Sequence, residues 1–134
     1  MQYMLLIYLD EQGLTEAQRE ACYLESAQFA HELNAKGQYL AAAPLHPTAT
    51  ATSVQLRDGK RLVTDGPFAE TREQLGGYFL IDVENLDMAI DIAGRIPAGR
   101  WGTVEIRPVV EVPSLPAKLI SRAVDFAAQG STQR

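Results

Sequence analysis

The sequence contains few of the residues that build disulfide-linked, metal-binding or nucleic-acid-binding proteins. Cys22 is its single cysteine, so no intramolecular disulfide can form and a thiolate metal site is not expected. The net charge of −5 lacks the basic footprint of a nucleic-acid-binding domain. Two histidines without HxH or HExxH spacing, and the absence of GxGxxG, P-loop and GxSxG motifs, predict neither a metal nor another cofactor.

Long apolar runs are missing as well. The apolar stretch from Tyr3 to Tyr8 spans only six residues, and no basic segment precedes it. Such a stretch is too short for the apolar core of a signal peptide and far too short to cross a bilayer. We therefore expect a cytoplasmic protein that does not associate with membranes.

What the sequence does contain fits a single globular domain. Its 134 residues are 46% hydrophobic and 22% charged, which are ordinary values for a globular chain large enough to bury a core. We expect this domain over residues 1–112. Residues 113–134 then form a C-terminal extension, in which apolar residues at helical spacing predict a third helix over 113–128.

Periodicity and turn residues predict the remaining elements. Alternating or continuous apolar patterns indicate strands over residues 3–9, 38–45, 50–57, 60–64, 77–83 and 103–107. Asp58-Gly59 joins two of these strands in a tight hairpin turn. One amphipathic helix begins at a capping box of Thr15 with Gln18 and ends at Gly37, and a second runs from Asn85 to Ile96.

These elements follow one another as strand, helix, strand, inserted hairpin, strand, helix, strand. Two halves of this kind predict an α+β fold of the ferredoxin-like βαββαβ type with an inserted β-hairpin. Both helices would cover one face of an antiparallel sheet. The other face also needs a cover, and a second copy of the same sheet is the expected one, so we predict a homodimer.

The least generic stretch of the sequence lies between residues 62 and 83. It contains Asp65-Gly66-Pro67-Phe68 followed by a polar segment and Gly76-Gly77. On these residues the chain resembles the DGPF-type branch of the YCII-related proteins, and the likeness extends over residues 1 to about 110. The resemblance implies a dimeric α+β barrel, and it implies genes that often lie beside those of extracytoplasmic-function sigma factors. It implies no settled reaction.

The resemblance also marks a departure from the family pattern. YCII-related proteins carry a histidine on the first helix and an aspartate just before the last strand, which are proposed as a catalytic pair. Counted back from Gly37, the helix position is Ser26 in this sequence, and Ile96 stands before Pro97 in place of the aspartate. That pair cannot be transferred to this chain, so any chemistry is expected from the DGPF stretch.

Three residues are candidates for catalysis: Asp65, Glu70 and His46. Asp65 either accepts backbone hydrogen bonds and holds an unusual turn, or lies at the mouth of a cleft as a general acid or base. Glu70 either belongs to a solvated, capped turn or forms a carboxylate pair with Asp65, in which one pKa would rise. His46, between two prolines, is either merely exposed or faces this loop.

The candidates for ligand binding are Gly66, Pro67, Phe68, Thr71 and Arg107. For Gly66, Pro67 and Phe68 the alternative is structural, with Phe68 inserted into the core. Thr71 and Gln74 repeat the spacing of a capping box, which favours one helical turn there. Arg107, near the end of the last strand, either pairs with an acid of the DGPF loop or binds a ligand carboxylate.

Two functions of different classes follow from these patterns. In the first, the homodimer binds a small organic molecule in a cleft between its two sheets, and acid–base catalysis on that molecule is the extension of this hypothesis. In the second, the protein is a non-catalytic accessory protein that contacts a protein partner, such as a sigma factor, through the extension at 113–134.

Overall fold

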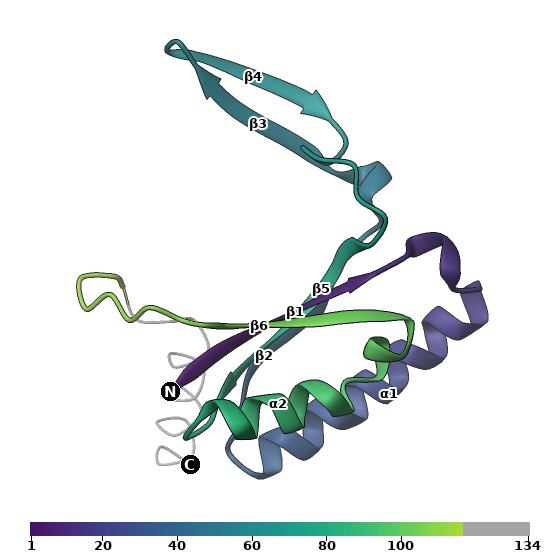
Figure 1. Ribbon diagram of the computed structural model, residues 1–134, viewed down its shortest axis with the longest axis vertical. Helices are drawn as coiled ribbons and strands as arrows, with labels where there is room; N and C mark the ends of the chain where they lie inside the picture. Colours follow the sequence, from purple (N-terminus) through teal and green to yellow (C-terminus); the bar gives the residue numbers. More distant parts are fainter. Residues whose placement is uncertain (117–134) are drawn as a thin grey trace, which may run out of the picture.

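A computed structural model describes residues 1–116 of the protein (Figure 1). Its strands are β1 (Gln2–Leu9), β2 (Tyr39–Pro44), β3 (Thr52–Arg57), β4 (Lys60–Asp65), β5 (Gln74–Asp82) and β6 (Gly102–Pro108). Its α-helices are α1 (Glu16–Ala35) and α2 (Leu86–Arg95), and its 3-10 helices are η1 (Glu11–Gly13), η2 (Thr48–Thr50) and η3 (Pro97–Trp101). The strands and helices follow the predicted order.

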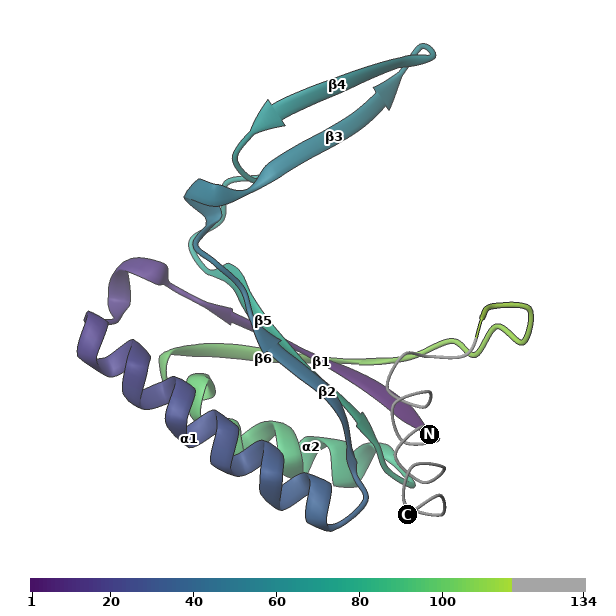
Figure 2. The same ribbon diagram turned by 180° about the vertical axis from the view of Figure 1, so that it is seen from behind.

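The predicted ferredoxin-like α+β fold is confirmed. Four strands form an antiparallel sheet in the order β2-β5-β1-β6, and β3 pairs only with β4. Both helices lie on the same side of the four-stranded sheet, as opposite views of the ribbon show (Figures 1 and 2). The core lies between the sheet and the helices, where Leu5, Leu33, Ile81 and Ile92 are completely buried.

Local sequence signals determine where the elements begin and end. The capping box is present, because the side chain of Thr15 accepts a bond from the Gln18 N–H while the Gln18 side chain accepts one from the Thr15 N–H. Asn85 caps α2 by accepting from the Met88 N–H at 3.0 Å. Asp58 and Gly59 have φ angles of 51° and 75°, so the predicted tight turn is confirmed.

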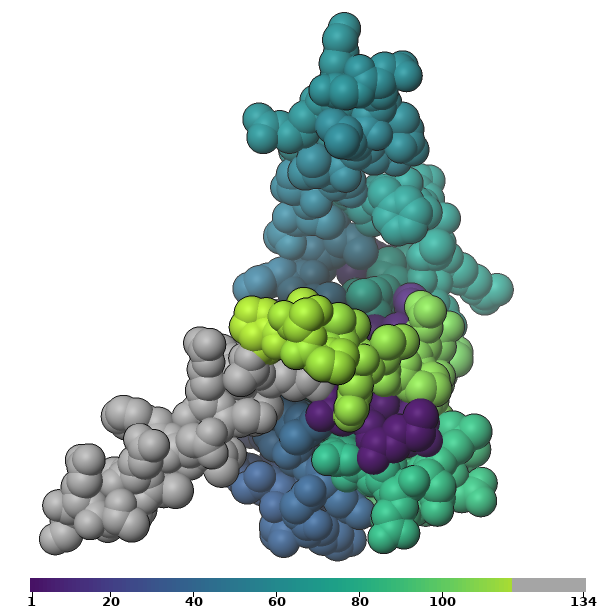
Figure 3. All heavy atoms as spheres, turned by 90° about the vertical axis from the view of Figure 1, so that its left-hand side faces the viewer, coloured from purple at the N-terminus to yellow at the C-terminus, as the bar shows by residue number. Residues whose placement is uncertain are grey.

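The β3–β4 hairpin stands apart from the rest of the molecule. The ribbon and the space-filling view both show it projecting beyond the sheet and helices (Figures 1 and 3). Its base is held by two hydrogen bonds of 2.7 Å, one from the Gly66 N–H to the Ala51 carbonyl and one from the Ser53 hydroxyl to the Gly66 carbonyl. With a φ of 92°, Gly66 adopts a conformation that favours glycine.

The side of the sheet away from the helices is covered by no helix or strand of residues 1–116. Alternation along the central strands places one set of half-exposed or exposed apolar side chains on it, which we call the free sheet face: Met4, Leu6, Tyr8, Leu75, Tyr78 and Leu80. Within residues 1–116, the helices and the hairpin therefore leave this face uncovered, as the predicted order of elements implies.

Two local predictions are wrong. Thr71 does not begin a helical turn, because its hydroxyl donates to the Glu73 carbonyl and its carbonyl accepts from the Gln74 side chain in a bend that leads into β5. Phe68 is not inserted into the core, since 85% of it is exposed. The predicted helix over 113–128 lies largely outside the described residues.

Candidate functional site

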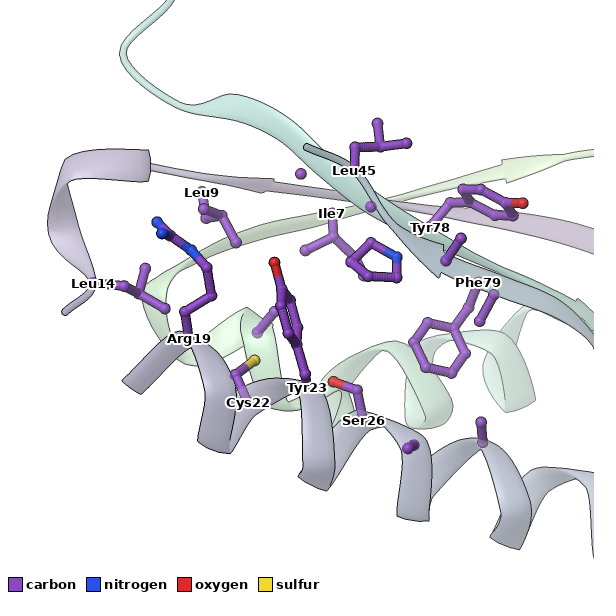
Figure 4. Close-up of a pocket in the computed structure, with 18 of the residues that line it drawn as sticks. Ile7, Leu9, Leu14, Arg19, Cys22, Tyr23, Ser26, Leu45, Tyr78 and Phe79 are labelled. Atoms are coloured by element: carbon purple, nitrogen blue, oxygen red, sulfur yellow. The ribbon is translucent and has the colours of Figure 1, made fainter. Parts of the chain in front are cut away.

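A pocket of about 470 Å³ lies between helix α1 and the sheet (Figure 4). The apolar side chains of Ile7, Leu9 and Phe79 come from strands β1 and β5 and form its sheet side. The opposite wall is the face of α1. The volume of the pocket is within the usual range for small-molecule sites. Such sites are usually apolar enclosures with a few polar groups.

One face of α1 supplies most of the polar groups of this pocket. Residues three or four positions apart on a helix share a face, and the pocket-lining residues of α1 have this spacing: Arg19, Cys22, Tyr23, Ser26, Ala27, Ala30, His31 and Asn34. Figure 4 shows Arg19, Tyr23 and Ser26 pointing from the helix toward the sheet. The same helix buries Phe29 and Leu33 in the core, so its two functions lie on adjacent faces.

Arg19 brings a positive charge to the pocket. Its guanidinium donates to the backbone carbonyl of Glu11 at 3.1 Å, and no carboxylate of residues 1–116 lies within ion-pair distance of it. The Glu11 carboxylate is engaged elsewhere, since it accepts from the Thr48 N–H at 2.8 Å and from the Thr48 hydroxyl at 2.9 Å. The guanidinium of Arg19 is thus held in place by one hydrogen bond, and its other N–H groups can donate to a ligand.

Tyr23 stands beside Arg19 in the pocket (Figure 4). It is 45% exposed, and its hydroxyl makes no hydrogen bond with the described residues. A phenol hydroxyl can both donate and accept. Arg19 and Tyr23 together therefore offer a cation and a hydroxyl to an oxygen-bearing group that enters the pocket.

Cys22 is buried in the wall of the pocket. Burial raises the pKa of its thiol, and the nearby Glu25 carboxylate adds to this, while the hydrogen bond with Ser26 and the charge of Arg100 act in the opposite direction. A thiol with a raised pKa stays protonated at neutral pH and is a poor nucleophile. Cys22 therefore contributes mainly to the wall of the pocket.

None of the sequence-predicted site residues lines this pocket. Asp65, Gly66, Pro67, Phe68, Glu70 and Thr71 lie where the hairpin returns to the sheet, and all but Gly66 are exposed. His46 is exposed between the pocket-lining residues Leu45 and Pro47. Arg107 is exposed on β6 opposite Met4 and makes no ion pair with residues 1–116.

Within one chain, the DGPF stretch has a structural role at the base of the β3–β4 hairpin. Asp65 pairs with Thr52 as the last residue of β4, and Gly66 closes the base of the hairpin. Further along, the Glu73 carboxylate accepts a hydrogen bond of 3.0 Å from the Thr103 hydroxyl of β6. The catalytic and ligand-binding parts predicted for this stretch stay predictions.

Sequence reasoning missed Arg19, Tyr23 and His31 because polar residues on an amphipathic helix ordinarily face solvent. Among the polar residues of α1 that line the pocket, only Ser26 was indicated by the sequence as a functional position. It stands at the helix position where the resemblance places a family histidine, and in the structure it does line the pocket. The counterpart of the family aspartate, Ile96, is instead buried in the core.

Comparison with known proteins identifies the family. Residues 1–113 match the YCII-related domain. The chain belongs to the YCII-related family. An uncharacterized protein of Rhizobium meliloti (strain 1021) is 35% identical to this YCII-related chain over 128 residues, with 85% of this chain and 100% of that protein covered.

A solved structure shares the fold. The 5-chloro-2-hydroxyhydroquinone dehydrochlorinase of Burkholderia phenoliruptrix AC1100, in complex with 2,5-dihydroxybenzoquinone, superimposes with a TM-score of 0.53. The match covers 84% of this chain and 96% of that chain at 12% sequence identity, so it supports the α+β fold alone.

Two negative observations apply to residues 1–116. No group of three or more His, Cys, Asp and Glu side chains is arranged to hold a metal ion in that part of the chain. No helix described there is both long and apolar enough to cross a membrane.

Proposed function

We propose that this YCII-related protein binds a small, planar organic anion in the pocket between α1 and the sheet. The observation that carries the proposal is the position of Arg19. Its guanidinium lines an apolar pocket and has no carboxylate partner among the described residues. An enolate, phenolate or carboxylate oxygen of a ligand would provide that partner.

The size and make-up of the pocket define the ligand further. Ile7, Leu9 and Phe79 offer apolar contact to one ring, and about 470 Å³ accommodates a molecule of one or two rings. The ring would lie against these side chains while its charged oxygen meets Arg19 and the Tyr23 hydroxyl. This arrangement assigns binding to the pocket and places no catalytic step on the protonated Cys22 thiol.

The related solved structure suggests a first probe. Its bound 2,5-dihydroxybenzoquinone is a single planar ring with acidic hydroxyl groups, which are the features that the pocket of this chain would recognise. The Ser26 position supports the same placement, since the resemblance puts a functional family residue there. The expected membership of the DGPF-type branch is part of the proposal and rests on Asp65 to Thr71.

Calorimetric titration of 2,5-dihydroxybenzoquinone into the protein tests the proposal. Arg19→Gln removes a charge-assisted contact worth about 1.5–3 kcal/mol, so we expect the affinity to fall roughly 10- to 100-fold. Arg57→Gln is the matched control, because it removes the same charge from an exposed site outside the pocket and outside the DGPF stretch. It should leave the affinity within about twofold.

Two outcomes would reject the pocket as the site. One is equal loss of affinity in the Arg19 and Arg57 variants, which would indicate general charge attraction. The other is full affinity in Arg19→Gln together with loss in Asp65→Asn, which would place the ligand at the DGPF stretch. Unfolding curves of each variant show whether a loss reflects the site or the fold.

A further inference from the structure

The pocket between α1 and the sheet is longer than a single ring requires. Helix α1 lines it from Arg19 to Asn34, a length of about 22 Å along the helix axis at 1.5 Å per residue. On the sheet side, the lining of β2 and the residue after it runs from Tyr39 to Leu45, about 20 Å of extended chain. Helix α1 and β2 are in contact and run in opposite directions (Figure 2), so both lengths measure the same passage.

Small side chains keep the middle of this passage open. Ala27 and Ala30 line it from α1, and Ala42 and Ala43 line it from β2. Gly77 of β5, which also belongs to the lining, has no side chain at all. The two ends of the pocket are therefore joined by a narrow apolar stretch, which a larger side chain at one of these positions would close.

The strand register orders the pocket residues along the passage. Strand β5 carries Phe79 two residues after the partner of Ile7 and two residues before Ile81, which is the partner of Tyr39. Figure 4 shows Ile7 nearer to Arg19 and Phe79 farther along α1. A ring held beside Arg19 therefore leaves the part of the pocket between Phe79 and Tyr39 to another part of the ligand.

The end of the pocket away from Arg19 offers hydrogen bonds. His31 and Asn34 of α1 and Tyr39 of β2 line it, and none of their side chains makes a hydrogen bond or ion pair with residues 1–116. An imidazole, an amide and a phenol hydroxyl can each donate and accept. His31 and Asn34 are exposed, so this end opens to solvent and suits a polar group of the ligand.

We propose that the ligand of this pocket has two ends joined by a linear apolar chain. Its aromatic anion lies at Arg19, the chain follows the passage beside Ala27, and a hydrogen-bonding group at the end of the chain meets His31 and Asn34. The proposal rests on the proposed function for the ring and adds the chain. An unbranched chain is selected, because the narrow middle of the pocket has no room for a second ring.

Three probes with the same ring test the chain by calorimetric titration. They are 2,5-dihydroxybenzoquinone, its 3-octyl derivative, and the octyl derivative with a terminal hydroxyl group. Each fully buried methylene strengthens binding about fourfold, so the octyl probe should bind at least about tenfold more tightly than the bare ring. The hydroxyl probe should bind at least as tightly as the octyl probe, because its end group exchanges water for His31 and Asn34.

Ala27→Leu closes the passage from an exposed position, where the larger side chain leaves the core intact. We expect it to leave the affinity for the bare ring within about twofold of the unaltered protein and to abolish the gain from the octyl chain. Ala21→Leu is the matched control, since it makes the same change at an exposed position of α1 outside the pocket and should preserve the gain. Ala42→Leu narrows the passage from β2 and should act like Ala27→Leu. Unfolding curves show whether each variant is folded.

The polar end is tested separately with His31→Leu. This variant should bind the octyl probe more tightly than the hydroxyl probe, which reverses the order expected for the unaltered protein. An unchanged ratio of the two affinities in His31→Leu would overturn the assignment of the polar end.

The remaining outcomes separate the chain from the ring. If no probe binds, the proposed function fails and the chain fails with it. If the ring binds through Arg19 but the octyl chain gives no gain, the site stands and the passage is overturned. A gain that survives in both Ala27→Leu and Ala42→Leu also overturns the passage, because the chain would then lie elsewhere.

Discussion

At the scale of single residues, burial decides which pocket side chains can react. Cys22 and Ser26 are hydrogen-bonded neighbours on α1, yet burial keeps the pKa of the Cys22 thiol above its ordinary value. Arg19, by contrast, keeps its charge and is held by a backbone carbonyl. In the proposed site, recognition would therefore depend on Arg19 and Tyr23, while Cys22 and the apolar side chains shape the space between them.

This account predicts that Cys22 reacts slowly with thiol reagents. Because the folded-state pKa lies above the ordinary 9.0, thiolate is scarcer at neutral pH than in a free cysteine, and burial restricts access further. Alkylation by iodoacetamide at pH 7.5, followed by mass spectrometry, should be much slower than alkylation of glutathione under the same conditions. Labelling as fast as that of glutathione would contradict it.

The raised pKa of Cys22 also makes the free energy of unfolding depend on pH. The thiol's contribution is fully present below its unfolded-state pKa of 9.0 and is lost as the pH rises through the folded-state pKa. The free energy of unfolding should therefore fall more above this pH in the unaltered protein than in Cys22→Ala. Parallel urea titrations of the two proteins on either side of pH 9.0 measure the difference.

At the scale of elements, close backbone packing fixes where β6 begins. A Cβ added at Gly102 would overlap the Tyr8 carbonyl oxygen of β1, and neither backbone can move without breaking the β1–β6 pairing. The pairing in turn places Thr103 where it bonds Glu73. Gly94 in α2 differs, since nothing lies within 4 Å of an added Cβ there.

These two glycines predict substitutions of opposite sign. Gly102→Ala should lower the free energy of unfolding by about 3 kcal/mol or prevent folding, because it forces a steric overlap. Gly94→Ala should raise it by about 0.5–1 kcal/mol, because alanine is favoured inside a helix. Urea denaturation of both variants checks the pair, and a stable Gly102→Ala protein would show that the β1–β6 register is wrong.

The elements were largely predictable because their signals are local. The Thr15 capping box, the Asn85 cap and the Asp58-Gly59 turn each depend on a few neighbouring residues. The DGPF stretch shows the limit of such reasoning: Phe68 is apolar, but burial is a tertiary property, and a large apolar side chain can equally lie on the surface. Thr71 and Gln74 have the spacing of a capping box, but no helical turn forms there because Gln74 is the first residue of β5.

At the scale of the whole molecule, the sequence predicted a bare sheet face but not the pocket. The apolar residues on both sides of the first strand, with Met4, Leu6 and Tyr8 on one of them, indicated a second sheet face that the helices leave uncovered. The pocket arises from the spacing between α1 and the sheet, which no run of residues encodes. The polar residues of α1 could therefore not be told from a solvent-facing stripe. The predicted homodimer and sigma-factor partner stay predictions.

Both candidate sites can be compared in one titration. Adding 2,5-dihydroxybenzoquinone to ¹⁵N-labelled protein and following the amide signals by NMR shows where the ligand binds. We predict saturable shifts concentrated at Arg19, Cys22, Tyr23 and Ser26 of α1 and at Ile7 and Phe79 of the sheet. Shifts confined to Asp65 through Thr71, or no saturable shifts at all, would contradict a binding site between α1 and the sheet.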